Sequence, residues 1–201
     1  MATRREELAE AATDYAIENG LIGLSLRPLA EALGTSDRML LYHFRDKNDL
    51  VATILRTATT RSVASIRALP PSSDVRAAVL DLWRATSTGR LQACQRLYVE
   101  AASLGLFGHE PYATEVREAN TVWMSALADH FAAVGLGTAA RRQAANLVDA
   151  AFMGLQLDQP LDSRARQQRT VRDLADSVAA RWGPLETARS PVRQDGQPGS
   201  A

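Results

Sequence analysis

The residues best suited to chemistry lie in one short stretch, LGTSDRMLLYHF, residues 33–44. Within it, Arg38, Tyr42 and His43 supply a guanidinium, a phenol and an imidazole close together. These groups donate hydrogen bonds to anions, and a guanidinium can also donate two to the O6/N7 edge of guanine. Thr35 and Ser36 add two hydroxyls just upstream. The pattern therefore favours non-covalent recognition of a phosphate-rich, hydrogen-bonding surface.

The chain offers no comparable set of residues for catalysis. The patterns GxxxxGKS/T, HExxH and GxSxG are absent from the sequence. His43, His109 and His130 show no metal-ligand spacing with one another or with Cys94, the single cysteine. Asp129 precedes His130, but neighbours on a helix point about 100° apart. We therefore expect a protein that is not an enzyme and requires neither a cofactor nor a metal.

Composition sets the remaining limits. The chain has 201 residues, 46% of them hydrophobic, enough for one or two domains with a buried core. Lys plus Arg and Asp plus Glu number 23 each, so any site for a polyanion must be local. A single cysteine excludes an internal disulfide framework, and no apolar run has the length of a signal peptide or a membrane span. We expect a soluble, cytoplasmic protein with no membrane partner.

Helical periodicity dominates the sequence, and no segment alternates as a strand would, so an all-α fold is predicted. The first helix is expected over 4–19, with an apolar stripe made of Leu8, Ala11, Ala12, Tyr15 and Ala16. Ser25, Ser36 and Asp46 are candidate N-caps of the next three helices. These and the later helices are predicted over 26–33, 37–43, 46–69, 73–88, 90–104, 111–134, 138–157 and 163–182.

The two short helices and the glycine-containing turn between them form a helix-turn-helix unit, with the first helix covering its apolar back. We expect Leu29, Ala30, Leu33, Leu40 and Phe44 to be buried there. The remaining face of the third helix would then enter the major groove of double-stranded DNA, and Lys47 would hold a phosphate. The alternative is a helical partner-binding protein whose helix-turn-helix contacts protein. The candidate DNA-binding residues are Arg27, Thr35, Ser36, Asp37, Arg38, Met39, Tyr42, His43 and Lys47.

The run SLRPLAEALGTSDRMLLYHFRDKNDL resembles the N-terminal domain of the TetR family of bacterial transcriptional regulators. The match is carried by Arg27, Ala30, Gly34, Ser36, Leu40, His43, Phe44 and Lys47. Leu41 stands where the family most often has a phosphate-contacting tyrosine, and we assign that role to Tyr42.

This resemblance implies how the chain is organised and what it does. It implies a DNA-binding domain over 1–48 and a helical ligand-binding and dimerisation domain over 49–183. The sequence after 183 is rich in Pro, Gly and charge, so 184–201 is expected to be a disordered tail. The implied function is a repressor that a small-molecule effector releases from a near-palindromic operator.

The resemblance also implies a homodimer in which the last two helices pack against their copies in the partner. Small and apolar residues form a stripe along each of these two helices, although the stripes could instead pack in the subunit's own core. The candidate interface residues are Ala144, Leu147, Ala151, Gly154, Leu155, Leu174, Val178 and Trp182.

The middle helices are expected to bind the effector, which we predict to be largely apolar because bulky side chains with occasional polar tips gather there. Ordinary core packing is the alternative for each of them. The candidate pocket residues are Trp83, Tyr98, Phe107, His109, Trp123, Met124, Phe131 and Phe152. The fourth helix would carry the signal, since it begins beside the DNA-facing Lys47 and ends in the ligand-binding part.

Overall fold

The structure of the protein is a computed structural model that describes residues 3–158, 161 and 163–183. Within these ranges the chain forms helices and no strand, so the all-α prediction is confirmed. The predicted tail, 184–201, lies outside the described residues. The helices are α1 (Arg4–Asn19), α2 (Leu26–Ala32), α3 (Asp37–His43), α4 (Lys47–Arg67), α5 (Val75–Thr86), α6 (Gly89–Leu106), α7 (Tyr112–Ala133), α8 (Thr138–Leu157) and α9 (Arg164–Trp182).

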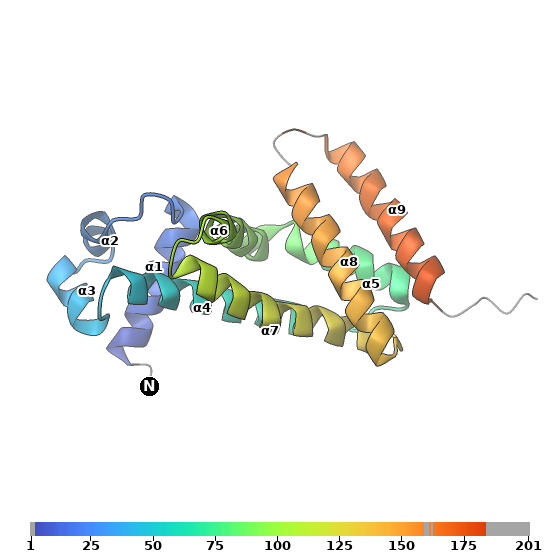
Figure 1. The fold of residues 1–201 in the computed structure, drawn as a ribbon, viewed down its shortest axis with the longest axis horizontal. Coiled ribbons are helices and arrows are strands. Elements are labelled where there is room, and N and C mark those ends of the chain that lie inside the picture. The colour runs from blue at the N-terminus through green and yellow to red at the C-terminus, as the bar shows by residue number, and fades with distance from the viewer. Residues whose placement is uncertain (1–2, 159–160, 162, 184–201) are drawn as a thin grey trace, which may run out of the picture.

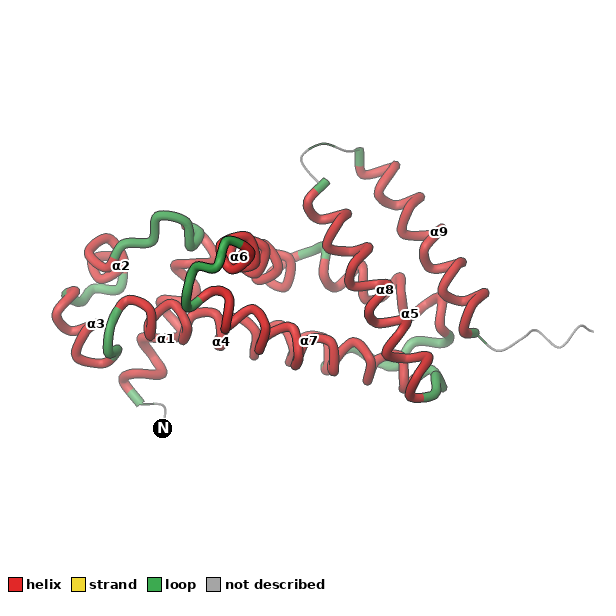
Figure 2. The backbone as a smooth tube through the Cα atoms, in the orientation of Figure 1, coloured by secondary structure: helices red, strands yellow, loops and turns green. Residues whose placement is uncertain are grey.

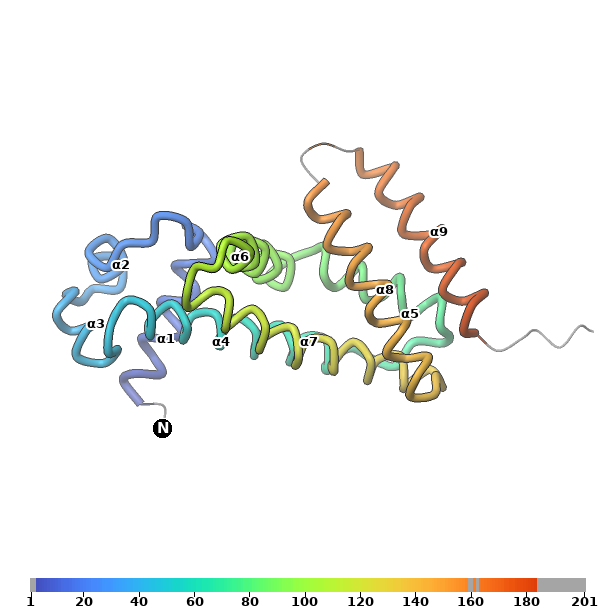
Figure 3. The backbone as a smooth tube through the Cα atoms, viewed as in Figure 1, coloured from blue at the N-terminus to red at the C-terminus, as the bar shows by residue number. Residues whose placement is uncertain are grey.

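The molecule is elongated, with its N-terminal helices at one end (Figure 1). α1, α2 and α3 lie together there, while α5, α8 and α9 lie at the opposite end. α4 and α7 run side by side along the long axis and join the two ends. α6 lies between the two ends of the molecule and is seen nearly end-on. Figure 2 shows that short loops connect the helices, and Figure 3 allows the chain to be followed from end to end.

Side-chain caps fix where α3 and α4 begin. The hydroxyl of Ser36 accepts a hydrogen bond from the N–H of Met39 at 3.2 Å, and the carboxylate of Asp46 accepts one from the N–H of Asp49 at 2.8 Å. Both N-cap predictions are thus confirmed, because each cap satisfies a backbone donor of the first turn. Ser25 occupies the N-cap position of α2, but its side chain makes no capping hydrogen bond.

Two hydrophobic cores hold the fold together, and α4 contributes to both. Leu50 and Ile54 of α4 pack into the N-terminal core, and Val63 and Ile66 pack into the core built mainly by α5, α7, α8 and α9. Leu97 of α6 also belongs to the N-terminal core. Packing therefore continues across the predicted domain boundary at 48/49, and α4 and α6 tie the two parts together.

The first helix shows one error in the sequence-based interpretation. Ala11, predicted to lie on the apolar stripe, is exposed, whereas Ala9 and Thr13 are buried. Thr13 can be buried because its hydroxyl donates a hydrogen bond to the carbonyl oxygen of Ala9 at 2.7 Å. Across the described helices, none combines the length and the apolar character needed to cross a lipid bilayer.

Candidate functional site

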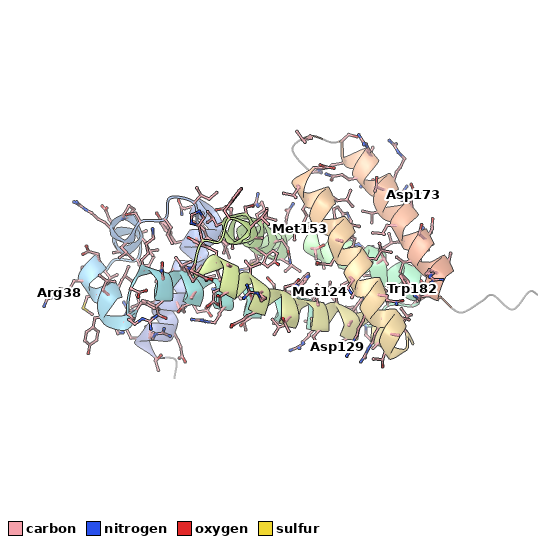
Figure 4. The ribbon with its side chains drawn as sticks, in the orientation of Figure 1. Arg38, Met124, Asp129, Met153, Asp173 and Trp182 are labelled. Atoms are coloured by element: carbon pink, nitrogen blue, oxygen red, sulfur yellow. The ribbon has the colours of Figure 1, made fainter. Side chains whose placement is uncertain are left out.

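Helix α3 presents one face to solvent at the extreme end of the molecule. Leu40 and Phe44 are 0% and 1% exposed and anchor the helix on the N-terminal core, as the sequence predicted. On the other face, Tyr42 is 80% exposed and Met39 is 45% exposed. Arg38 is exposed as well, and Figure 4 shows it at the tip of the molecule. One face of this short helix thus packs on the N-terminal core, and the other exposes hydrogen-bond donors to solvent.

The other predicted DNA-binding residues surround this face. Arg27, Ser36, Asp37 and Lys47 are exposed, on α2, in the turn, on α3 and at the start of α4. The fold therefore brings α2, α3 and the start of α4, which carry these residues, to one end of the molecule (Figure 1). Two of them are less open, because Thr35 and His43 are half-buried.

Two residues that sequence reasoning missed shape this surface. Leu41, given no role, is 45% exposed on α3. Arg5 of α1 donates from Nε to the carbonyl oxygen of His43 at 3.1 Å, and its guanidinium lies 4.9 Å from the centre of the Phe44 ring. Arg5 therefore fixes the C-terminal end of α3. Nothing local in the sequence signals this contact, because the two partners of the hydrogen bond are 38 residues apart.

Negative charge also lies beside this surface. The N–H of Asp49 donates to Asp46, and this hydrogen bond lowers the pKa of the Asp46 carboxyl below its ordinary value. Arg45 lies 3.4 Å from the same carboxylate, with its own side chain 82% exposed. Positive charge near α3 is thus partly offset, so specific donors rather than bulk charge must supply any selectivity.

A second candidate site is a cavity of about 550 Å³, including the space at its mouth, between α4, α6, α7 and α8. Its walls are mainly apolar, with a few polar side chains among them: Thr59, Gln95, Tyr98, Glu115, Asn120 and Asp149.

Of the predicted pocket residues, Tyr98 and Trp123 line this cavity. Four others are placed elsewhere by packing. Phe131 and Phe152 are 0% and 4% exposed inside the second core, where the Trp83 ring packs edge-on against Phe152 with centroids 5.1 Å apart. Met124 lines a separate surface depression between α7 and α8.

The two remaining candidates lie in the connection between α6 and α7. Phe107 is 79% exposed and His109 is exposed too, so neither borders the cavity. A sequence pattern marks a side chain as apolar or bulky, but it does not show which packed surface borders empty space. The cavity residues Glu115 and Asp149 were missed for the same reason.

The two carboxylates of the cavity are held differently. Asp149 accepts a hydrogen bond from the indole N–H of Trp123 at 2.7 Å. Burial raises the pKa of Asp149, and the Trp123 hydrogen bond opposes this. Glu115 is 6% exposed, and its Oε1 accepts from Arg56 at 2.7 Å. Burial likewise raises the pKa of Glu115, against the effect of the Arg56 charge.

Polar contacts connect the N-terminal helices to the helices that line the cavity. Asp14 of α1 is paired with Arg61 of α4 at 2.7 Å and with Arg90 of α6 at 2.5 Å. Glu100 of α6 accepts hydrogen bonds from the backbone N–H groups of Leu21 at 2.7 Å and Ile22 at 3.1 Å, in the loop between α1 and α2. Movement of α6 at the cavity would therefore act directly on the N-terminal helices.

The candidate interface residues on α8 and α9 fall into two groups. Ala144 and Val178 are 0% exposed and Leu155 is 8% exposed, so they serve the subunit's own packing and offer no surface to a partner. The others retain exposed surface: Leu147 and Gly154 are exposed, and Ala151, Leu174 and Trp182 are half-buried. The three buried residues thus form an inward row of the predicted stripes, and the other five form an outward row that retains exposed surface.

Comparison with known proteins supports the resemblance noted in the sequence. Residues 8–54 match the family described as bacterial regulatory proteins, tetR family. This match covers α1 from Leu8 to the first turns of α4, and so includes the helix-turn-helix. Among curated proteins, none matches the chain.

Solved structures of similar fold extend over nearly the whole chain. A transcriptional regulator from Rhodococcus sp. Rha1 is 23% identical, covering 90% of this chain and 98% of its own, with a TM-score of 0.73. A TetR transcriptional regulator from Legionella pneumophila is 16% identical, covering 88% and 97%, with a TM-score of 0.68. The multidrug binding protein EbrR in complex with proflavin is 22% identical, covering 88% and 99%, with a TM-score of 0.64.

Together these findings define the class of protein: an all-helical chain with the fold of bacterial transcriptional regulators. Its N-terminal region matches the TetR family over residues 8–54, which confirms the resemblance seen in the sequence.

Proposed function

We propose that the protein is a sequence-specific DNA-binding transcriptional regulator of the bacterial cytoplasm. The observation that carries the proposal is the exposed face of α3, where Arg38 and Tyr42 project from a helix anchored by Leu40 and Phe44. Arg38 would read a guanine edge or hold a phosphate, and Tyr42 would donate to a phosphate oxygen. Lys47 at the start of α4 adds a second phosphate contact.

The regulator works as a homodimer on a near-palindromic operator. A two-fold pair of α3 helices would reach successive major grooves about 34 Å apart, and this spacing requires two linked subunits. The outward row on α8 and α9, which includes Leu147, Gly154 and Leu174, supports pairing through these helices. Small residues such as Gly154 allow helices to approach closely.

A small, mainly apolar effector releases the regulator from DNA, so that the protein acts as a repressor. The cavity between α4, α6, α7 and α8 supports this part of the proposal. EbrR, which shares the fold, is described as complexed with proflavin, a small molecule. An effector that bound one arrangement of α4 and α6 better than the other would shift the spacing of the α3 helices, because both helices contact the N-terminal core.

Selection of binding sites from a randomised duplex pool, at a stated near-physiological salt concentration, tests the proposal. We expect enrichment of a near-palindromic site. Arg38→Ala should weaken binding to it by about 30-fold or more, because the two subunits together lose two bidentate contacts of roughly 1–3 kcal/mol each. Arg117→Ala, an exposed arginine of α7, is the matched control and should leave affinity unchanged.

Failure to enrich any site, by protein shown to be folded and dimeric, would contradict the proposal. Contact with a protein partner would then take its place. The exposed Met39 and Leu41 on α3 would suit such a contact, since apolar side chains are enriched in the centres of protein interfaces.

A further inference from the structure

The cavity carries negative charge without lining cations. Glu115 of α7 and Asp149 of α8 both line it, and the described lining residues include no Arg, Lys or His. The remaining polar side chains there are neutral, such as Asn120 and Gln95. A carboxylate held in a largely apolar cavity is unfavourable unless something positive or hydrogen-bonding approaches it. The two carboxylates thus indicate which charge a ligand of the cavity should carry, whereas the apolar walls do not.

Asp149 is the less compensated of the two carboxylates. It accepts one hydrogen bond, from Trp123, and forms no ion pair with any residue that the structure describes. Burial raises the pKa of Asp149, which is the expected cost of keeping this charge away from water. A cationic ligand would relieve that cost by direct pairing.

Aromatic rings lie close to this carboxylate. Trp123 is hydrogen-bonded to Asp149, and the charge of Asp149 contributes to a raised pKa of Tyr98, behind the larger effect of burial. Indole and phenol faces attract cations through their ring quadrupole, and they stack on flat apolar bodies. Met153, one turn beyond Asp149 on α8 and labelled in Figure 4, adds a polarisable side chain to the same wall.

Glu115 provides a second, independent sign of a ligand. Its Oε1 pairs with Arg56, but its Oε2 is buried and has no hydrogen-bond partner among the described residues. Buried acceptors are rarely left without a donor, and leaving one costs free energy. Glu115 lies eight residues before Trp123 on α7, so these two lining residues are about 12 Å apart along the helix.

We propose that the cavity selects a positively charged organic amine with a flat apolar body. The ammonium group pairs with Asp149 between Tyr98 and Trp123, and the apolar body extends along α7 towards the free oxygen of Glu115, which accepts a hydrogen bond from a donor on a longer ligand. The name effector for this amine rests on the proposed function above, whereas its binding does not require DNA.

Three compounds of the same shape test the charge preference: 1-naphthylmethylamine, 1-naphthalenemethanol and 1-naphthaleneacetic acid. Their affinities for the full chain are measured by titration calorimetry near neutral pH, where the amine is protonated. We expect the amine to bind about 10- to 100-fold more tightly than the alcohol, as one charged hydrogen bond at a partly buried site implies, and the acid to bind most weakly.

Asp149→Asn should remove the preference for the amine while the alcohol still binds, because the amide oxygen can keep the Trp123 hydrogen bond and the fold. Asp129→Asn is the matched control. Asp129, labelled in Figure 4, is an exposed carboxylate on α7 that does not line the cavity, and its replacement should leave the preference intact.

Equal affinity for the amine and the alcohol, an unchanged preference in Asp149→Asn, or no binding of the amine at millimolar concentration would each overturn the proposal. The assay contains no DNA, so its outcome is separate from the operator selection. If an operator is enriched but the amine is not preferred, the proposed DNA-binding function stands and this ligand class is rejected. If the amine is preferred but no operator is enriched, the ligand class stands and the proposed DNA-binding function is rejected.

Discussion

Glu100 links the cavity-lining helix α6 to the loop between α1 and α2, and replacing it with alanine tests that link. Its carboxylate accepts from the N–H of Leu21 at 2.7 Å and from that of Ile22 at 3.1 Å. Leu21 is 1% exposed, so its N–H loses a charged acceptor that water cannot easily replace, at a cost of roughly 1.5–3 kcal/mol. Ile22 is 68% exposed, and water can take over its hydrogen bond. We therefore expect Glu100→Ala to destabilise the loop by about 1.5–3 kcal/mol.

Amide hydrogen exchange reports this local change directly, since it follows the free energy of opening at each residue. The Leu21 amide should exchange roughly 10- to 150-fold faster in Glu100→Ala, at about 1.4 kcal/mol per tenfold. Protein concentration must be held constant, because dimerisation would add to apparent stability. Glu118→Ala, which removes an exposed carboxylate of α7, is the control and should change nothing. Unaltered exchange at Leu21 in a folded Glu100→Ala protein would refute the reasoning.

Three further outcomes follow from burial. Leu40→Ala should cost about 2–5 kcal/mol in urea unfolding, because Leu40 is 0% exposed and anchors α3; a cost near zero would mean that α3 is not packed as described. Asp149→Asn should raise the Tm near neutral pH, because burial raises the pKa of Asp149 and so disfavours its ionised form in the folded state. This gain should shrink as the pH falls through the folded-state pKa, and a constant gain would contradict the assignment. Burial lowers the pKa of His130, against the charge of Asp81, so unfolding takes up a proton below about pH 6.5 and the wild-type unfolding free energy should fall from about pH 7.5 to 5.5. His130→Gln should flatten that fall in urea titrations, and an unchanged slope would show that other groups cause it.

Much of the fold could be predicted from the sequence because its signals are local. The caps at Ser36 and Asp46 each act on an N–H three residues away, and apolar spacing alone identified Leu40 and Phe44 as the anchors of α3. Exposure of Arg38 and Tyr42 then followed from the helical repeat. Residues within about two helical turns on either side of Gly34 thus predict the helix-turn-helix and its exposed face.

The placement of the other residues depended on which helices pack together, and no local sequence pattern predicts that packing. Trp123 borders the cavity and Phe131, two turns later on α7, lies fully inside the core, although both read as apolar positions of one helix. Ala144 faces inward and Leu147 faces outward on α8 for the same reason. Asp149 and Glu115 read as ordinary acidic residues until α4, α6, α7 and α8 close around them.

The sequence by itself determined the helices, their caps and the donor-bearing face of α3, because hydrogen bonds and apolar repeats within a few residues set them. Only the tertiary structure decided where the cavity lies, which carboxylates it holds and how Arg5 and Glu100 brace the N-terminal helices. Those contacts join residues as far as 79 positions apart, and their energies arise only once packing has brought the helices together.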